Sequence, residues 1–242
     1  MWVICPDQPG IAIESIIHPI TRSRANQMTR FTIAAFGDST TAGTPGFKSP
    51  IEAPPHGAGD VQSQFAYWLM RAHEDWLVLN RGVNGERTDQ IRARLTHDIR
   101  ELDPDVLVVI AGVNDIYQGL GAEAVQCELQ TMYELAKTAG RNIPVVAASI
   151  LPYNTASADA NVRMRRVNDW IRDYAGRHQP VAYCDTRAAV ARPGDPDRLL
   201  SSPDGLHPSP EGYRLMALAL EPVIKKLLMR TGARGRVGRQ DA

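Results

Sequence analysis

FTIAAFGDSTTAG, residues 31–43, begins with an apolar run and ends in a polar turn that contains glycine. The run Phe31–Phe36 is short and almost wholly apolar, which is typical of a strand in a parallel sheet with both faces covered. Four similar runs follow it along the chain: Trp76–Asn80, Asp105–Ala111, Pro144–Ile150 and Pro180–Cys184. Helical patterns lie between these runs and after the last of them: Val61–His73, Thr88–Glu101, Ala122–Ala139, Ala160–Arg177 and Pro210–Met229. This alternation predicts an α/β fold with a five-stranded parallel sheet and helices on both of its faces.

The ends of the predicted helices carry their own signals. Asp60 and Thr88 stand where they can cap the first and second helices. Ser209 followed by Pro210 fits the start of the last helix. Gly140 follows the third helix, at a position where glycine commonly ends a helix.

Length favours one α/β domain, and composition argues against a nucleic-acid binder and a disulfide scaffold. The 242 residues suit a single α/β domain, and 43% of them are hydrophobic, which is enough to fill a core. Lys plus Arg and Asp plus Glu both number 27, so no basic surplus indicates a nucleic-acid partner. The cysteines include no C-x-x-C pair, which argues against a zinc site: Cys5, Cys127 and Cys184. We therefore expect neither nucleic acid nor metal.

The two ends of the chain stand apart from the domain, which we place at residues 28–230. Residues 1–27 are predicted to be an N-terminal extension or accessory arm. They have no basic start and no unbroken apolar stretch, and no run in the chain approaches the roughly 18 apolar residues of a membrane span. We therefore expect a cytoplasmic protein without an integral membrane segment. Residues 231–242 contain three arginines and three glycines and are predicted to be a disordered basic tail.

Polar turns that contain glycine follow the predicted strands at one edge of the sheet. Ligands bind at the carboxyl ends of the strands in open parallel sheets. GDSTT (Gly37–Thr41) follows the first strand, RGVNG (Arg81–Gly85) the second and GVND (Gly112–Asp115) the third. DGLHP (Asp204–Pro208) stands before the last helix. The convergence of four such turns carries more weight than any one of them.

Ser39 in the first of these turns is the candidate nucleophile. A serine hydroxyl needs an adjacent base, and His207 can remove its proton while Asp204 orients the imidazole and stabilises its charged form. The negative oxygen of a tetrahedral intermediate needs positioned hydrogen-bond donors. The Gly85 N–H, the Asn114 side-chain amide and the Ser39 N–H are the candidates for this oxyanion hole.

The segments FGDSTTAG, NRGVNGERT, GVND and DGLHP resemble the four sequence blocks of the SGNH (GDSL-like) hydrolase family, in the family's order. The resemblance implies a flavodoxin-like three-layer α/β/α sandwich, a small-molecule ester substrate and no cofactor. It also implies the roles given above for five residues: Ser39, Asp204, His207, Gly85 and Asn114. The first block reads Gly-Asp-Ser-Thr where the family has Gly-Asp-Ser-Leu. Because Thr40 has no proposed catalytic role, we expect no loss of activity from this departure.

Three further residues are candidates for lining the substrate site. Asn84 lies in the second polar turn, His56 lies in the long Pro/Gly-rich loop Gly43–Gly59, and Tyr153 follows the fourth predicted strand. Loops of this length in a compact domain are usually functional or mobile. We predict that Gly43–Gly59 borders the mouth of the site and helps to select the substrate.

The sequence thus predicts a serine esterase that hydrolyses carboxylic esters through an acyl-enzyme on Ser39. The polar character of Gly43–Gly59 and of Tyr153–Asn161 offers no long apolar channel, which favours a small acyl group such as acetyl. Two alternatives fit the same residues. A non-catalytic flavodoxin-like module could bind a carbohydrate or an anion at this edge, and an acyltransferase or thioesterase could use the same side chains.

Overall fold

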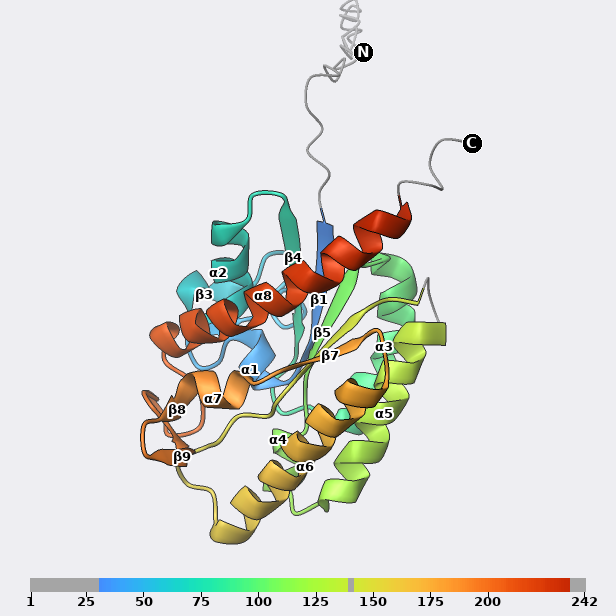
Figure 1. Cartoon of the computed structure of the whole chain (residues 1–242). Coiled ribbons are helices and arrows are strands. Elements are labelled where there is room, and N and C mark those ends of the chain that lie inside the picture. The colour runs from blue at the N-terminus through green and yellow to red at the C-terminus, as the bar shows by residue number, and fades with distance from the viewer. Residues whose placement is uncertain (1–30, 139–141, 236–242) are drawn as a thin grey trace, which may run out of the picture.

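The structure, a computed structural model, describes residues 31–138 and 142–235, the last five of them by their backbone alone. A five-stranded sheet forms its centre in the order β4-β1-β5-β6-β7, and each neighbouring pair is parallel (Figure 1). The strands are β1 (Phe31–Gly37), β4 (Trp76–Gly82), β5 (Val106–Ile110), β6 (Val145–Ala148) and β7 (Val181–Cys184). Counted among themselves they have the flavodoxin-like order 2-1-3-4-5. The predicted sheet is confirmed, with strand ends that differ by one or two residues.

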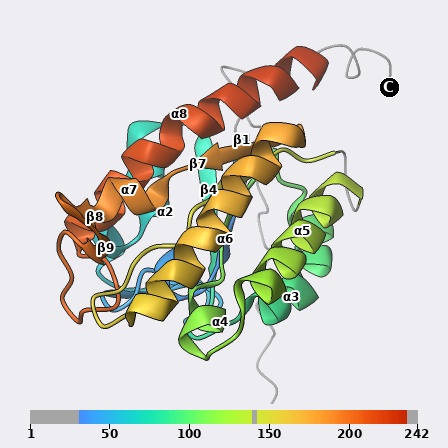
Figure 2. The same cartoon turned by 60° about the horizontal axis from the view of Figure 1, so that its bottom comes forward.

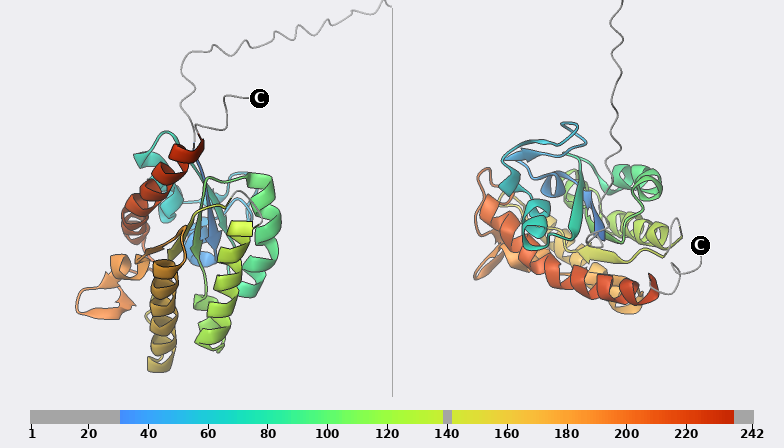
Figure 3. Two further views of the ribbon diagram at one scale, coloured as in Figure 1. Left: turned by 45° about the vertical axis from the view of Figure 1, so that its right-hand side comes forward. Right: turned by 90° about the horizontal axis from the view of Figure 1, so that it is seen from above.

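Helices cover both faces of the sheet. Three helices lie on one face and two on the other: α3 (Thr88–Leu102), α5 (Ala122–Thr138) and α6 (Ala158–Arg177), then α2 (Phe65–Ala72) and α8 (Pro210–Gly235). Figure 3 shows α8 and the α3–α5 pair on opposite sides of the strands. Along β1, Ala34 and Phe36 belong to the first core, whereas Ile33 and Ala35 belong to the second. Successive strand side chains point to opposite faces, so a strand between two covered faces must be apolar throughout.

The chain also forms short elements that the sequence does not predict. They are α1 (Ser39–Ala42), α4 (Val113–Tyr117), α7 (Thr186–Val190) and two small antiparallel ribbons, β2 (Phe47–Lys48) with β3 (Ala58–Gly59) and β8 (Ala191–Arg192) with β9 (Asp195–Leu199). In Figure 1, α1 and α4 lie at the lower ends of the strands, and Figure 2 turns this edge forward. Elements this short leave no periodic apolar pattern, because two turns of helix are needed to define one face.

The first predicted helix is interrupted in the structure. Val61–His73 is divided into a 3₁₀ turn, η1 (Val61–Ser63), and α2, because Gln64 between them is extended, with φ −136° and ψ 137°. The predicted cap at Asp60 is confirmed for η1, since its carboxylate accepts the Gln62 N–H at 3.0 Å.

The predicted cap at Thr88 is wrong, whereas the predicted start of the last helix is confirmed. Arg87 occupies the cap position of α3. Thr88 is already inside the helix, and its hydroxyl donates to Asp115 Oδ1 at 2.6 Å. At the start of α8, Ser209 Oγ accepts the Gly212 N–H at 3.3 Å, and Pro210 is the first helical residue.

The predicted chain ends fall largely outside the described residues. The extension 1–27 and Gly140 lie outside them. Helix α8 continues past Arg230 to Gly235, so residues 231–235 are helical where a disordered tail was predicted, and residues 236–242 lie outside the description. Within residues 31–138 and 142–235, no helix combines the length and apolar character that crossing a membrane requires.

Candidate active site

Ser39 begins α1 at the carboxyl end of β1, the strand at which the sheet order reverses. In this fold, ligands bind in the crevice at such a switch point. Asp38 caps the helix by accepting the Thr40 N–H at 2.9 Å. Ser39 is therefore the first helical residue, and its N–H is one of those that lack a partner within the helix. The side chains of this turn are buried, and Ser39 is 7% exposed.

The structure brings the three predicted triad residues into one hydrogen-bonded chain. His207 Nε2 lies 2.9 Å from Ser39 Oγ, and His207 Nδ1 lies 2.7 Å from Asp204 Oδ2. With Nδ1–H donating to the carboxylate, Nε2 presents its lone pair to the serine hydroxyl. This tautomer is the one that can remove the serine proton.

Asp204 is fixed by bonds within its own turn. Its Oδ1 accepts the backbone N–H groups of Leu206 and His207, both at 2.8 Å. Partial burial acts to raise the pKa of Asp204, but hydrogen bonds from the His207 ring and from the two N–H groups outweigh it and lower the pKa below its usual value. The carboxylate therefore stays ionised and can stabilise a positively charged imidazole.

The predicted oxyanion donors lie in the same cavity as Ser39 and His207. Gly85 has φ +76°, a left-handed conformation that favours glycine. Asn114 Nδ2 donates to the Glu86 carbonyl oxygen at 2.9 Å. Because an amide nitrogen carries two hydrogens, Asn114 has a second one for a ligand in the cavity.

Two buried carboxyl groups support the turns that carry the site. Asp115 accepts the Thr88 hydroxyl at 2.6 Å and the Thr88 N–H at 3.0 Å, and burial raises the pKa of Asp115. Burial also raises the pKa of Asp38 to about 7, although hydrogen bonds from Thr40 act to lower it. The neighbouring charge of Asp115 adds to that rise. Near neutral pH, Asp38 is therefore protonated in a large fraction of the molecules.

A cavity of about 300 Å³ opens beside the triad. The apolar part of its lining, which we call the apolar wall, is formed by Val113, Tyr117, Leu151, Pro152, Tyr153 and Leu206. Within it the rings of Tyr117 and Tyr153 meet edge to face, with centroids 5.7 Å apart. Thr44 and Asn84 add polar atoms to the lining, and the Thr44 hydroxyl donates to Asn84 Oδ1.

Two of the three predicted substrate-lining residues line the cavity. Asn84 and Tyr153 line the cavity, whereas His56 is exposed and lies outside it. The loop Gly43–Gly59 reaches the cavity only through Thr44. The rest of the loop folds back on itself through the β2–β3 pairing, and the Ser49 hydroxyl donates to the Gly82 carbonyl at 2.6 Å. Glu52 of the same loop accepts the N–H of the cavity residue Asn84 at 3.0 Å, so the loop also contacts the lining without entering the cavity there.

Sequence reasoning missed most of the apolar wall. Leu151 and Pro152 come three and four residues after Ala148, the last residue of β6, so the rule that sites form at the carboxyl ends of strands could have found them. Val113 and Tyr117 belong to α4, which has no sequence signal of its own.

Solved structures share this fold. A carbohydrate acetylesterase family member from Sinorhizobium meliloti superposes with a TM-score of 0.64 at 19% identity, covering 82% of this chain and 99% of that one. A member of the lipolytic protein G-D-S-L family from Veillonella parvula gives a TM-score of 0.67 at 22% identity, covering 81% and 98%. These likenesses show that the chain shares their fold, an α/β fold around a five-stranded parallel sheet.

Sequence comparison gives the family. The profile of the GDSL-like Lipase/Acylhydrolase family matches residues 35–215. An arylesterase from Vibrio mimicus is 25% identical over 193 residues, which is 76% of this chain and 84% of the relative. The platelet-activating factor acetylhydrolase IB subunit alpha1 of Bos taurus is 25% identical over 159 residues, covering 65% and 68%. The chain belongs to the GDSL-like lipase/acylhydrolase family and is a carboxylic ester hydrolase.

Proposed function

We propose that this protein is a serine esterase that hydrolyses esters of a small acyl group, such as acetyl, through an acyl-enzyme on Ser39. The observation that carries the proposal is the hydrogen-bonded chain from Ser39 through His207 to Asp204, at 2.9 Å and 2.7 Å. This chain stands at the wall of a cavity that also contains Gly85 and Asn114. A nucleophile, its base and two oxyanion donors therefore face one substrate-sized space.

The reaction follows from this placement. His207 Nε2 takes the proton of Ser39 as Oγ attacks the ester carbonyl carbon, and the carbonyl oxygen becomes negative. The N–H groups of Ser39 and Gly85 and the Asn114 amide stabilise that oxygen. His207 then protonates the leaving alcohol. In the second half, His207 removes a proton from water, which attacks the acyl group and releases Ser39 and the acid.

The size of the cavity supports a small acyl group. A volume of about 300 Å³ is at the lower end of ligand sites, which span roughly 300–1,000 Å³. Because part of the cavity lining is apolar, its polarity does not exclude a longer acyl chain. The limit on acyl-chain length that we propose therefore comes from the volume of the cavity. The names of the acetylhydrolase relative and of the carbohydrate acetylesterase neighbour agree with an acetyl ester.

A chain-length series tests this proposal. We expect kcat/KM to be highest for p-nitrophenyl acetate or propionate and to fall steadily towards the octanoate. Ser39→Ala should abolish the activity on every ester. A maximum at the octanoate would contradict the small acyl group, and full activity of Ser39→Ala would contradict the serine mechanism.

The contacts of the site and further assays on the same proteins distinguish the esterase from a binding module, an acyltransferase and a thioesterase. A non-catalytic binding module has no need of a serine hydroxyl within 2.9 Å of an imidazole, and this contact favours the esterase. An acyltransferase would transfer the acetyl group to an added alcohol in preference to water, so the ratio of acetate to new ester measures that activity. A thioesterase would prefer an acyl thioester to the matching oxygen ester.

A further inference from the structure

The turn that presents Gly85, residues Val83–Glu86, is connected to the strand that carries the nucleophile. We call this segment the oxyanion turn. At its start, the Val83 N–H donates to the Gly37 carbonyl oxygen at 3.1 Å. Gly37 is the last residue of β1 and stands two positions before Ser39. The start of the turn is therefore tied directly to the nucleophile strand.

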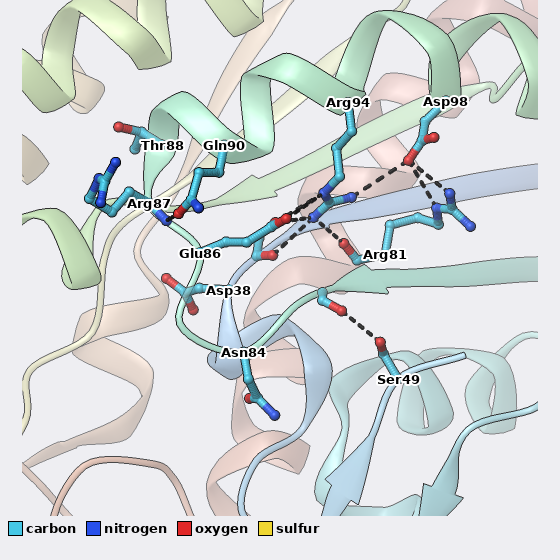
Figure 4. Close-up of polar contacts among 12 residues, drawn as sticks. Asp38, Ser49, Arg81, Asn84, Glu86, Arg87, Thr88, Gln90, Arg94 and Asp98 are labelled. Carbon is cyan, nitrogen blue, oxygen red and sulfur yellow. Dashed lines mark hydrogen bonds and ion pairs between the residues drawn. The ribbon is translucent and has the colours of Figure 1, made fainter. Parts of the chain in front are cut away.

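The end of the oxyanion turn is tied to the second donor. The Glu86 carbonyl oxygen accepts the Asn114 side-chain amide at 2.9 Å. The Glu86 carboxylate accepts three bonds from the Arg94 guanidinium (Figure 4): Oε2 accepts Nε at 2.9 Å and Nη2 at 2.8 Å, and Oε1 accepts Nε at 3.3 Å. One residue thus holds Asn114 through its backbone and Arg94 through its side chain.

Arg94 closes the connection back to the nucleophile strand. Its Nη2 donates to the Gly37 carbonyl at 3.3 Å and to the Arg81 carbonyl at 2.7 Å, at the ends of β1 and β4. Its guanidinium lies 5.6 Å from the centroid of the Phe36 ring. The side chains of Arg94 and Glu86 are 20% and 16% exposed. Charge-assisted bonds in such partly buried places are stronger and more directional than surface ion pairs.

We propose that Arg94 and Glu86 are positioning residues that set the distance from Ser39 to both oxyanion donors. The Gly37 carbonyl oxygen accepts hydrogen bonds from the Val83 N–H and from Arg94, which also binds Glu86. The start of the oxyanion turn is therefore bonded to this oxygen directly, and its end is bonded to it through Arg94. Neither charged side chain lines the cavity. Their effect is therefore expected on the transition state, in which the oxyanion forms, and not on ground-state binding of the ester. This inference rests on the proposed serine mechanism.

A matched pair of variants tests the proposal. Arg94→Met removes the link, whereas Arg92→Met removes a guanidinium on the same helix whose ion pair with Glu128 does not involve the oxyanion turn or Arg94. We expect Arg94→Met to lower kcat roughly 10- to 100-fold, less than the loss of a whole donor, with KM nearly unchanged. Phenylboronic acid, which forms a tetrahedral adduct with serine, should bind the variant more weakly by a similar factor. Arg92→Met should keep the wild-type rate.

A double-mutant cycle separates positioning from general stability. In an Asn114→Ala background, Arg94→Met should lower kcat by a clearly smaller factor, because one of the donors that it positions is already missing. Arg94→Lys keeps the charge and one donor nitrogen, so it should recover part of the rate. It replaces Arg94→Met in the test if that variant does not fold. Additive effects, a change in KM alone or an equal loss in Arg92→Met would overturn the proposal. Ser39→Ala is measured alongside, since its full activity would contradict the serine mechanism instead.

Discussion

Ser39 Oγ lies 2.9 Å from His207 Nε2, but the segments that carry these two residues are stabilised differently. The turn around Ser39 is buried, and Asp38 within it is 1% exposed. This turn depends on contacts that are distant in sequence, such as the Gly37 carbonyl with Val83 and Arg94. We refer to it, together with the oxyanion turn, as the nucleophile half of the site.

The segment Asp204–His207, the base half, is stabilised mainly by its own residues. Asp204 accepts the N–H groups of Leu206 and His207 as well as the His207 ring, and its side chain is 32% exposed. The Gly205 carbonyl adds one distant bond, from the Asn154 N–H at 2.7 Å. The difference implies that changes in the nucleophile half alter both stability and rate, whereas changes in the base half alter mainly the rate.

The largest effect is expected from Asp204→Asn. The substitution leaves an oxygen that can accept the Leu206 and His207 N–H groups, but it removes the charge that fixes the imidazole tautomer. We expect kcat to fall about 10⁴-fold, as for the loss of this charge in serine proteases. The melting temperature should change little. Asp195→Asn, at another partly exposed acid, is the control and should retain the wild-type rate. A large loss of stability in Asp204→Asn would contradict the comparison.

Asn114→Ala should have the next largest effect. It removes one oxyanion donor, so kcat should fall roughly 10²- to 10³-fold with little change in KM. It also leaves the Glu86 carbonyl without its partner, which should destabilise the fold by about 1 kcal/mol. Steady-state kinetics and urea denaturation measure the two effects. An unchanged kcat would mean that Asn114 serves only to hold Glu86.

Alanine substitutions at Gly37 in the nucleophile half and at Gly205 in the base half compare the two halves through the free energy of unfolding. A Cβ at Gly37 would lie 2.1 Å from Thr41 Oγ1 and 2.2 Å from the Ile110 carbonyl oxygen, so we expect a loss of roughly 3 kcal/mol. A Cβ at Gly205 would meet Asn154 Cβ at 3.9 Å, and only its φ of +76° is unfavourable, at about 1 kcal/mol. Equal losses in urea denaturation would show that the two halves are equally constrained.

The pH dependence of stability should have opposite signs in the two halves. The pKa of Asp38 is raised to about 7 from 3.8, so its contribution to stability is present below pH 3.8 and is lost as the pH rises through about 7. Asp38→Asn should therefore become more stable relative to wild type across this range. The pKa of Asp204 is lowered, so its contribution is present above pH 3.8 and is lost in more acidic solution. Urea denaturation at several pH values checks both slopes, and a flat difference for Asp38→Asn would contradict a buried neutral carboxyl.

The two halves also differ in how well the sequence predicted them. The base half lies within four residues, so its spacing alone predicts that Asp204 and His207 meet. For the nucleophile half, the sequence predicted the turns that contain Ser39 and Gly85 but not the contacts that hold these turns together. Glu86 and Arg94 gave no signal, because a charged residue that faces inward from α3 looks like one on a solvated surface. Asp38 likewise gave no sign that burial would raise its pKa.

The sequence by itself determined the five strands, their alternation with helices and the four turns that meet at one edge. These features follow from local patterns, since apolar runs and glycine turns act over a few residues. The tertiary structure alone decided that His56 lies away from the cavity, that Tyr117 and Tyr153 form an apolar wall, and that Arg94 links the oxyanion turn to the nucleophile strand. Each of these depends on side chains that are distant in sequence. Their approach is set by the packing of whole elements, which no local pattern records.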